Sequence, residues 1–397
     1  MSLLSHLWPT DDAHAVVVAS TVVVTTLVYS LLRAALWPPT PSVIRGPLHT
    51  VLPTLSEREL EVLEYKTDAF PGARDVDTPY GMIRVYEWGP DSGPKVLLVH
   101  GISTTCQTLG KLAHGLVAHG CRVMLFDLFG RGFSDGVGDL PHDARLYVSQ
   151  MLLALASSPL PWTGAGALGV VGYSLGGGVA VHFAAAFPAL VARLVLLAPA
   201  GLIRRAKFGP LTRFLFTAGL VPDRLLAPLT ARRLKRPIAA GIRKPPPPSA
   251  RDIKDHHHLL YVQDALAEAS DPPSAAASET SIEKAVLRYV EWMVAHHAGF
   301  VPAFIGCVRG APLYDQHATF AKLAARPPGS TLVVLGAADE IVAADEYERD
   351  ALPLLGGRER VRWVVVDAGH DLPMTRAAEV LEAICNAWGL FQRPDAA

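Results

Sequence analysis

Residues 170–178 read VVGYSLGGG, an apolar run that ends in a serine flanked by glycines. Ser174 ends an apolar run and lies between Gly172 and Gly176 in the pattern Gly-x-Ser-x-Gly. A sharp turn from a strand into a helix forces unfavourable backbone angles on the serine, and neighbours without β-carbons relieve the crowding. The pattern therefore predicts either an ordinary Gly/Ser turn or a nucleophile held at an elbow. Partners elsewhere in the chain have to decide between the two.

Apolar runs of strand length alternate with helix-length segments on both sides of this stretch. The continuous runs lie at 95–101, 121–132, 167–174, 193–201, 331–339 and 360–370, and 81–89 alternates like a strand of an antiparallel pair. Continuous apolar runs are typical of strands buried on both faces of a parallel sheet. Their alternation with helices predicts a doubly wound α/β sheet, whose chemistry gathers at the carboxyl ends of the strands.

Composition excludes several function classes. The 397 residues include 36 basic and 37 acidic side chains, for a net charge of −1, so no basic field is present to hold nucleic acid. The four cysteines form no Cys-x-x-Cys pair, which gives a zinc ribbon or dithiol site no support. The histidines at 256–258 have no cysteine or carboxylate cluster at ligand spacing. We therefore predict no metal and no cofactor.

The amino terminus carries an apolar stretch, because residues 13–32 contain no acid, lysine or arginine. Twenty helical residues span about 30 Å, the thickness of bilayer hydrocarbon. The sequence predicts a single membrane anchor over 1–37, and a cleaved signal peptide or a buried helix stays open as an alternative. Arg33 and Arg45 follow the stretch, so the positive-inside rule predicts that the main domain is cytosolic.

Changes in composition predict the domain organisation. A proline-containing linker occupies 38–61, and the α/β core follows in two parts, 62–202 and 331–397. Between these parts, 203–330 interrupts the alternation with helix-like pieces and a run of four prolines, and we interpret it as an inserted helical cap. A separate helical domain is the alternative, and it is less favoured because both ends return to the sheet.

The partners that Ser174 requires follow later strands. A serine hydroxyl needs a base within hydrogen-bond reach, and the base needs a carboxylate to fix its tautomer. His370 follows the last strand in DAGHDLP, and Asp339 follows the penultimate strand in GAADEIV, giving the order Ser, Asp, His. Glu340 and Asp367 are competing acids. We predict Ser174 as nucleophile, His370 as base and Asp339 as the orienting acid.

Two amides are candidates for the oxyanion hole. The amide of Leu175 follows the serine at the start of a helix, and that of Ile102 follows the His-Gly pair after the first buried strand. The glycine-rich turn DLFGRGFSD at 127–135 lacks the lysine of a phosphate loop, so we predict structural packing there, with Asp127 hydrogen-bonded locally.

Taken together, these motifs resemble the α/β-hydrolase superfamily over roughly 62–390, since the HG pair, the 127–135 turn, the GYSLG elbow, Asp339 and His370 appear in the family's order. The resemblance implies an eight-stranded, mostly parallel sheet with an inserted lid, and the roles just named for the three side chains and two amides. The anchor and the PAGL turn at 199–202 look like membrane-bound monoacylglycerol-lipase-type members.

The function expected is a membrane-anchored serine hydrolase that cleaves carboxylic esters, of lipids such as monoacylglycerols, through an acyl-enzyme. Its partners would be a small ester substrate and the bilayer. Hydrolysis of small non-lipid esters or of carbon–carbon bonds is the alternative among enzymes, because the same triad serves these reactions. A catalytically silent interaction protein on this scaffold is the alternative from another class, and it is less favoured because no triad residue is missing.

Overall fold

An eight-stranded sheet, in the order β10-β9-β8-β7-β4-β5-β3-β2, forms the centre of the computed structural model. The model describes residues 12–36, 39–164, 168–203, 216, 221–234 and 281–390. The strands are β2 (Ala73–Val76), β3 (Ile83–Trp88), β4 (Lys95–Val99), β5 (Arg122–Phe126), β7 (Leu168–Tyr173), β8 (Val191–Leu197), β9 (Thr331–Gly336) and β10 (Val361–Val366). Strand β3 pairs antiparallel with β2 and β5, and the other neighbours pair in parallel. The prediction of an eight-stranded, mostly parallel sheet is confirmed.

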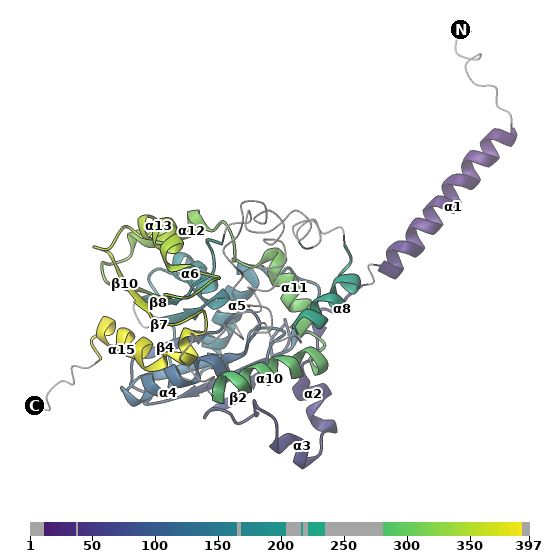
Figure 1. Cartoon of the computed structure of the whole chain (residues 1–397). Helices are drawn as coiled ribbons and strands as arrows, with labels where there is room; N and C mark the ends of the chain where they lie inside the picture. The colour runs from purple at the N-terminus through teal and green to yellow at the C-terminus, as the bar shows by residue number, and fades with distance from the viewer. Residues whose placement is uncertain are drawn as a thin grey trace, which may run out of the picture.

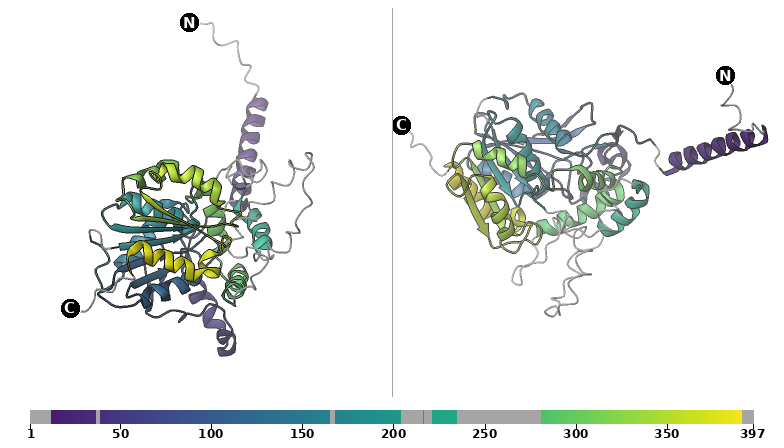
Figure 2. Two further views of the ribbon diagram at one scale, coloured as in Figure 1. Left: turned by 60° about the vertical axis from the view of Figure 1, so that its left-hand side comes forward. Right: turned by 90° about the horizontal axis from the view of Figure 1, so that it is seen from above.

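Helices cover both faces of the sheet (Figures 1 and 2). One face carries α4 (Gly110–Ala118) and α15 (Ala377–Trp388), which pack together. The other carries the row α5 (Ala144–Ala156), α6 (Leu175–Ala186), α12 (His317–Lys322) and α13 (Ala344–Leu354). Because both faces are covered, the central strands are buried throughout, which explains their continuous apolar sequences.

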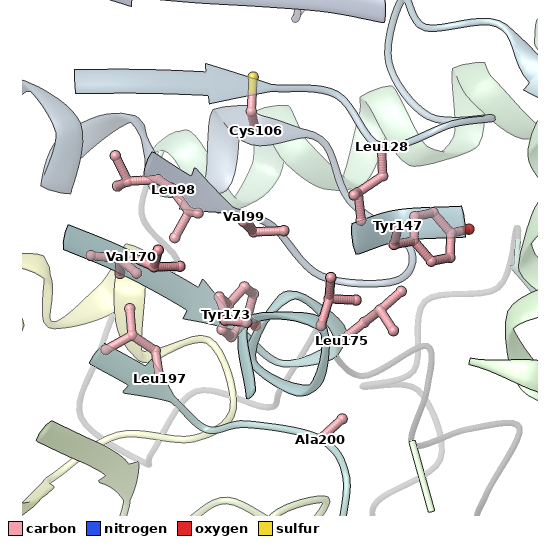
Figure 3. Close-up of a cluster of buried hydrophobic side chains, with 14 of the residues drawn as sticks. Leu98, Val99, Cys106, Leu128, Tyr147, Val170, Tyr173, Leu175, Leu197 and Ala200 are labelled. Carbon is pink, nitrogen blue, oxygen red and sulfur yellow. The ribbon is translucent and has the colours of Figure 1, made fainter. Parts of the chain in front are cut away.

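The core converges on the carboxyl ends of the central strands. Figure 3 shows Val99 at the end of one strand, Val170 and Tyr173 along the next, and Leu197 on the third, with Leu175 at the turn that follows Tyr173. All five side chains have no more than 1% of their surface exposed. The turn after Tyr173 is therefore built on a packed base that fixes its position.

Helix α1 (Asp12–Leu36) projects away from the sheet domain (Figure 1). Its residues His14–Leu36 have a mean hydropathy of 2.2, and none of this stretch is buried within the fold. The buried-helix alternative is therefore wrong. By length and composition α1 is a candidate membrane span, and a signal sequence near the amino terminus has the same properties.

The segment predicted as a linker carries short elements that pack on the domain. Strand β1 (Val43–Ile44) pairs antiparallel with β6 (Gly136–Val137), and α2 (Pro47–Thr50), a 3-10 turn (Leu52–Thr54) and α3 (Glu57–Glu61) follow. The buried carboxylate of Asp135 accepts hydrogen bonds from the Gly46 amide at 2.6 Å, the Met82 amide at 3.0 Å and the Arg45 guanidinium at 3.0 Å. This carboxylate ties the chain that leaves α1 to the loops after β5.

Helices α8 (Asp223–Leu234), α10 (Ser281–His296) and α11 (Phe300–Gly310) interrupt the sheet between β8 and β9. Helix α8 packs on α10 and α11, and α10 packs on η2 (Cys106–Leu109) and α14 (Leu372–Thr375). The later α12 lies in the helix layer beside α6 and α13. The extent 203–330 of the predicted cap stays a prediction, and its proline run and the histidines at 256–258 lie outside the described residues.

Candidate active site

The turn between β7 and α6 holds Ser174 in a strained backbone conformation, with φ +53° and ψ −117°. Close backbone contacts explain the glycines around it. A Cβ on Gly172 would lie 2.4 Å from the Gly176 carbonyl oxygen, and one on Gly176 would lie 2.2 Å from that of Val99. No side chain fits at either position, so the glycines are required for the helix to approach the sheet this closely.

Three predicted side chains meet at the carboxyl edge of the sheet. The Nε2 atom of His370 lies 3.0 Å from Ser174 Oγ, and its Nδ1 atom lies 2.8 Å from Asp339 Oδ2. The serine comes from the turn after β7, the aspartate from the loop after β9 and the histidine from the loop after β10. All three residues are buried, and Ser174 is 3% exposed. A hydrogen-bonded chain therefore runs from hydroxyl to imidazole to carboxylate.

The acid is fixed by its own loop. The Oδ1 atom of Asp339 accepts hydrogen bonds from the amides of Ile341 and Val342, both at 2.8 Å, which leaves Oδ2 for the histidine. Glu340 is exposed, and the Asp367 carboxylate is 81% exposed, 3.7 Å from Arg376. Of the three acids considered from the sequence, the structure brings Asp339 to the imidazole.

Tyr173, which no sequence motif indicated, joins the elbow to the loop that carries the histidine. Its hydroxyl donates a 3.0 Å hydrogen bond to the His370 carbonyl oxygen, and the two rings lie 5.4 Å apart. The residue before the serine thus holds the base in register with the nucleophile. A tyrosine in a fully buried strand needs a hydrogen-bond partner, and that was the available signal.

The two predicted oxyanion amides follow the carboxyl ends of two neighbouring strands, β4 and β7. Leu175 is the first residue of α6, where amides have no acceptor within the helix. Ile102 is buried in the loop after β4, which pairs with β7, so its peptide lies at the same sheet edge. The first turn of a helix favours negative charge, which suits an oxyanion at this position.

Arg131 supports the loop of Ile102 from behind. It has no exposed surface, and its Nε atom donates to the Ile102 carbonyl at 2.9 Å. The rest of the guanidinium donates to the Phe129 carbonyl (2.8 Å), the Tyr147 hydroxyl (2.9 Å) and the Cys307 sulfur (3.2 Å). The glycine-rich pattern around it hid this residue from the sequence analysis. A charged residue in a turn between buried apolar segments was the signal.

Asp127 lies in the same turn and is hydrogen-bonded locally. It accepts from the Cys106 amide (3.1 Å), the Phe133 amide (3.1 Å) and the Tyr65 hydroxyl (3.0 Å). Burial raises the pKa of its carboxyl to about 6, although these hydrogen bonds act in the opposite direction. It does not belong to the Ser174 cluster, and its bonds hold the 127–135 turn against the segment after β4.

His100, at the end of β4, is neutral. Its Nε2 atom accepts the Leu128 amide at 2.9 Å, so Nδ1 carries the proton and donates to the Gly101 carbonyl oxygen at 2.9 Å. Burial lowers the pKa of this imidazole to about 3. The histidine therefore serves as a fixed link between two strand-end loops. Within the part of the chain that the structure describes, no three His, Cys, Asp or Glu side chains gather at a metal-binding distance.

Comparison with known proteins gives matches in sequence and in structure. A family model described as serine aminopeptidase, S33, matches residues 91–266. The lipase LipV of Mycobacterium tuberculosis is 34% identical over 178 residues, which are 45% of this chain and 62% of the lipase. The match thus spans less than two thirds of that relative's own length.

Solved structures share the fold at low identity. An esterase from Rhodococcus is 17% identical, with a TM-score of 0.55 over 80% of this chain and 99% of the esterase. A bromoperoxidase from Bacillus anthracis is 16% identical, also with a TM-score of 0.55, over 80% and 99% of the two chains. With the strand order and the strained serine elbow, these likenesses show that the chain has the α/β-hydrolase fold.

Proposed function

We propose that this chain is a membrane-anchored serine hydrolase that cleaves carboxylic esters of lipids, such as monoacylglycerols, through an acyl-enzyme. The observation that carries the proposal is the position of His370, which contacts Ser174 Oγ with one ring nitrogen and the Asp339 carboxylate with the other. This is the arrangement that makes a serine hydroxyl nucleophilic near neutral pH.

Acylation begins when Ser174 Oγ attacks the ester carbonyl carbon and His370 Nε2 takes the hydroxyl proton. The Asp339 carboxylate accepts a hydrogen bond from Nδ1–H and stabilises the imidazolium that forms. The carbonyl oxygen becomes negative and is bound by the amides of Ile102 and Leu175. When the tetrahedral adduct collapses, the bond to the alcohol oxygen breaks and the Nε2 proton passes to the alcohol, leaving an acyl ester on the serine.

Deacylation repeats these steps with water. His370 Nε2 removes a proton from a water molecule as its oxygen attacks the acyl carbonyl. The second tetrahedral adduct collapses to the carboxylic acid, and the proton returns to Ser174 Oγ. The cycle consumes one water and regenerates the serine, so the chain needs no redox partner for the proposed reaction.

Two observations support a lipid ester and a membrane location. Helix α1 is long and apolar enough to cross a bilayer and is not covered by the domain. A matched relative carries the name of a lipase. Arg33 lies in the last turn of α1, so the positive-inside rule favours a cytosolic catalytic domain.

A fluorophosphonate probe tests the catalytic proposal, because it forms a stable bond with an activated serine. The full chain should be labelled at Ser174, and the Ser174→Ala variant should not be labelled. Ser330→Ala removes an exposed serine far from His370 in the sequence and serves as the matched control, with labelling as in the parent. Equal labelling of all three proteins, or labelling of none while they are folded, would refute the proposal.

A substrate panel then tests the ester class. We expect monoacylglycerols presented in vesicles to be cleaved faster than water-soluble short-chain esters. Preference for the short esters or for β-diketones would replace the lipid substrate with the small-ester or carbon–carbon reading. A folded chain that reacts with the fluorophosphonate but cleaves no compound of the panel would contradict the lipid-ester proposal.

A further inference from the structure

The connection between α1 and the domain is short. Helix α1 ends at Leu36, and the Thr40 hydroxyl already donates a 2.6 Å hydrogen bond to the Gly138 carbonyl oxygen. Four residue steps span at most about 14 Å when fully extended. If α1 crosses a bilayer, Thr40 therefore lies within about 14 Å of the membrane end of that helix, and the Gly138 loop is in direct contact with Thr40.

This loop leads by direct contacts to α8. It follows β6, where Gly136 lies against Gly299 at the start of α11, so closely that a Cβ on Gly299 would be 3.0 Å from the Gly136 α-carbon. In α11, Arg309 holds the beginning of α8 through its ion pair with Asp223 and a 3.1 Å hydrogen bond to the Val221 carbonyl. All three views in Figures 1 and 2 place α8 on the side of the domain from which α1 departs.

The outward face of α8 is apolar and basic. Leu225 is 54% exposed and Leu229 is 59% exposed, and their spacing of four residues places them on one side of the helix. Arg224 and Arg232 are exposed beside them. The described part of the chain exposes only five large apolar side chains outside α1. Two are these leucines, and Leu140, two residues after Gly138, is a third.

Among the residues that the structure describes, the acidic groups at this face do not cancel its charge. Asp223 is paired with Arg309, and Asp135 is buried and paired with Arg45, whose side chain is 59% exposed. Asp139 is an exposed carboxylate in the same loop. The exposed arginines outnumber it, so the face is attractive to an anionic surface.

We propose that α8 docks on the bilayer that holds α1, with its two leucines at the boundary of headgroups and acyl chains and Arg224 and Arg232 on anionic headgroups. A helix with an apolar side flanked by arginines is suited to this interface. The proposal rests on the membrane anchor of the proposed function.

An environment-sensitive fluorophore at residue 229 tests the docking. All four native cysteines are buried, so Leu229→Cys can be labelled selectively in the full chain. Glu382→Cys, on the exposed side of α15 across the domain, is the matched control. The proteins are reconstituted in vesicles of phosphatidylcholine alone and of phosphatidylcholine with about one third phosphatidylserine.

We expect the emission of the label at 229 to shift to the blue and to be quenched by a lipid-chain quencher, and both effects should be stronger in the anionic vesicles. The label at 382 should keep the emission of a fluorophore in water. Carbonate extraction of the same vesicles separates the two proposals. A chain that resists extraction while both labels report water overturns the docking alone. A chain that carbonate releases overturns the anchor and the docking together. A shift that follows protein density in the vesicle indicates a second copy of the chain and also overturns the docking.

The double variant Leu225→Glu, Leu229→Glu connects docking to activity. Both leucines are more than half exposed, whereas Ser174, Asp339 and His370 are buried, so hydrolysis of a water-soluble ester should stay as in the parent. Hydrolysis of a vesicle-borne ester should fall by about tenfold or more, because the helix no longer enters the interface. Equal rates of parent and variant on vesicle-borne ester would contradict the proposal.

Discussion

The Nε atom of Arg131 donates a 2.9 Å hydrogen bond to the carbonyl of Ile102 from a site without exposed surface. This contact connects the turn after β5 to the loop that would supply one oxyanion amide. A buried guanidinium with several fixed acceptors holds a loop more firmly than the loop's own backbone can.

Replacing this arginine with lysine should impair the chemical step. An ammonium at 131 reaches fewer of the acceptors, so the Ile102 peptide loses its fixed position. We expect Arg131→Lys to lower kcat by roughly tenfold to a hundredfold, with little change in KM, since misplaced oxyanion donors act in the transition state. Steady-state kinetics on a soluble ester give both constants. Tyr147→Phe removes another contact of Arg131 and should cost stability while kcat stays near the parent value. Equal kcat losses in the two variants would contradict a positioning role.

The Asp339 carboxylate determines which nitrogen of His370 carries the proton. Asp339→Asn keeps the shape of the side chain, but the amide nitrogen cannot accept a hydrogen bond from Nδ1–H. The substitution therefore favours the tautomer with its proton on Nε2, which cannot act as the base. We expect kcat to fall by about 10⁴. Asp367→Asn is the control, because its exposed carboxylate lies away from the imidazole, and it should be as active as the parent. An active Asp339→Asn variant would show that another acid orients the base.

The buried histidines should make the folded chain less stable as the pH falls. Burial lowers the pKa from the ordinary 6.5 to about 3 at His100 and to about 4 at His142 and His297. Between pH 6.5 and 4 the unfolded chain binds these protons and the native chain does not, so stability falls as the pH falls. Asp127 opposes this, since its pKa is raised to about 6 and the native carboxyl takes up a proton first.

Taken alone, these three histidines against the one carboxyl leave two protons in this range, so the four groups should lower the free energy of unfolding by up to about 2.7 kcal/mol per pH unit as the pH falls. Burial also lowers the pKa of His182, which acts in the same direction. Urea unfolding between pH 7 and pH 5 measures this slope. His142→Gln should reduce it by up to about 1.4 kcal/mol per unit. A stability that does not change over this range would contradict the neutral buried histidines.

Any side chain at the elbow glycines should clash with the neighbouring backbone. A Cβ on Gly176 would lie 2.2 Å from the Val99 carbonyl oxygen and 2.6 Å from that of His100, and both contacts are with backbone. Gly176→Ala should therefore cost roughly 3 kcal/mol or more and abolish activity. Gly310→Ala is the matched control, since its nearest contact would be an ordinary 3.6 Å, and it should change stability by less than about 1 kcal/mol. Thermal unfolding of both variants decides; similar midpoints would refute the steric argument.

Much of the candidate site could be predicted from local patterns. Continuous apolar runs identified the central strands, and the residues just after three of them were Ser174, Asp339 and His370. Parallel strands bring their carboxyl ends to one edge, so a correct strand pattern places these side chains at the same edge of the sheet. Their catalytic roles stay predictions until they are tested by substitution.

Other features depended on contacts that no local pattern encodes. Tyr173 reaches the carbonyl of a residue 197 positions away, and Arg131 reaches Cys307 across 176 positions. The prolines of 38–61 predicted a linker, whereas Asp135 binds this segment to the domain. The exposure of Leu225 and Leu229 could be recognised only from the packing of α8 on α11, which shows which side of α8 faces outward.

The sheet, the elbow and the chain order of the three predicted catalytic side chains could be inferred from the sequence, because burial on two faces and a strained turn each restrict the residues allowed nearby. The packed structure was needed to show which acid meets the imidazole, what supports the loop of Ile102 and which helix lies on the side of the domain from which α1 departs. These relationships depend on the distances between side chains that are remote in sequence, and such distances are set by the packing of the whole chain.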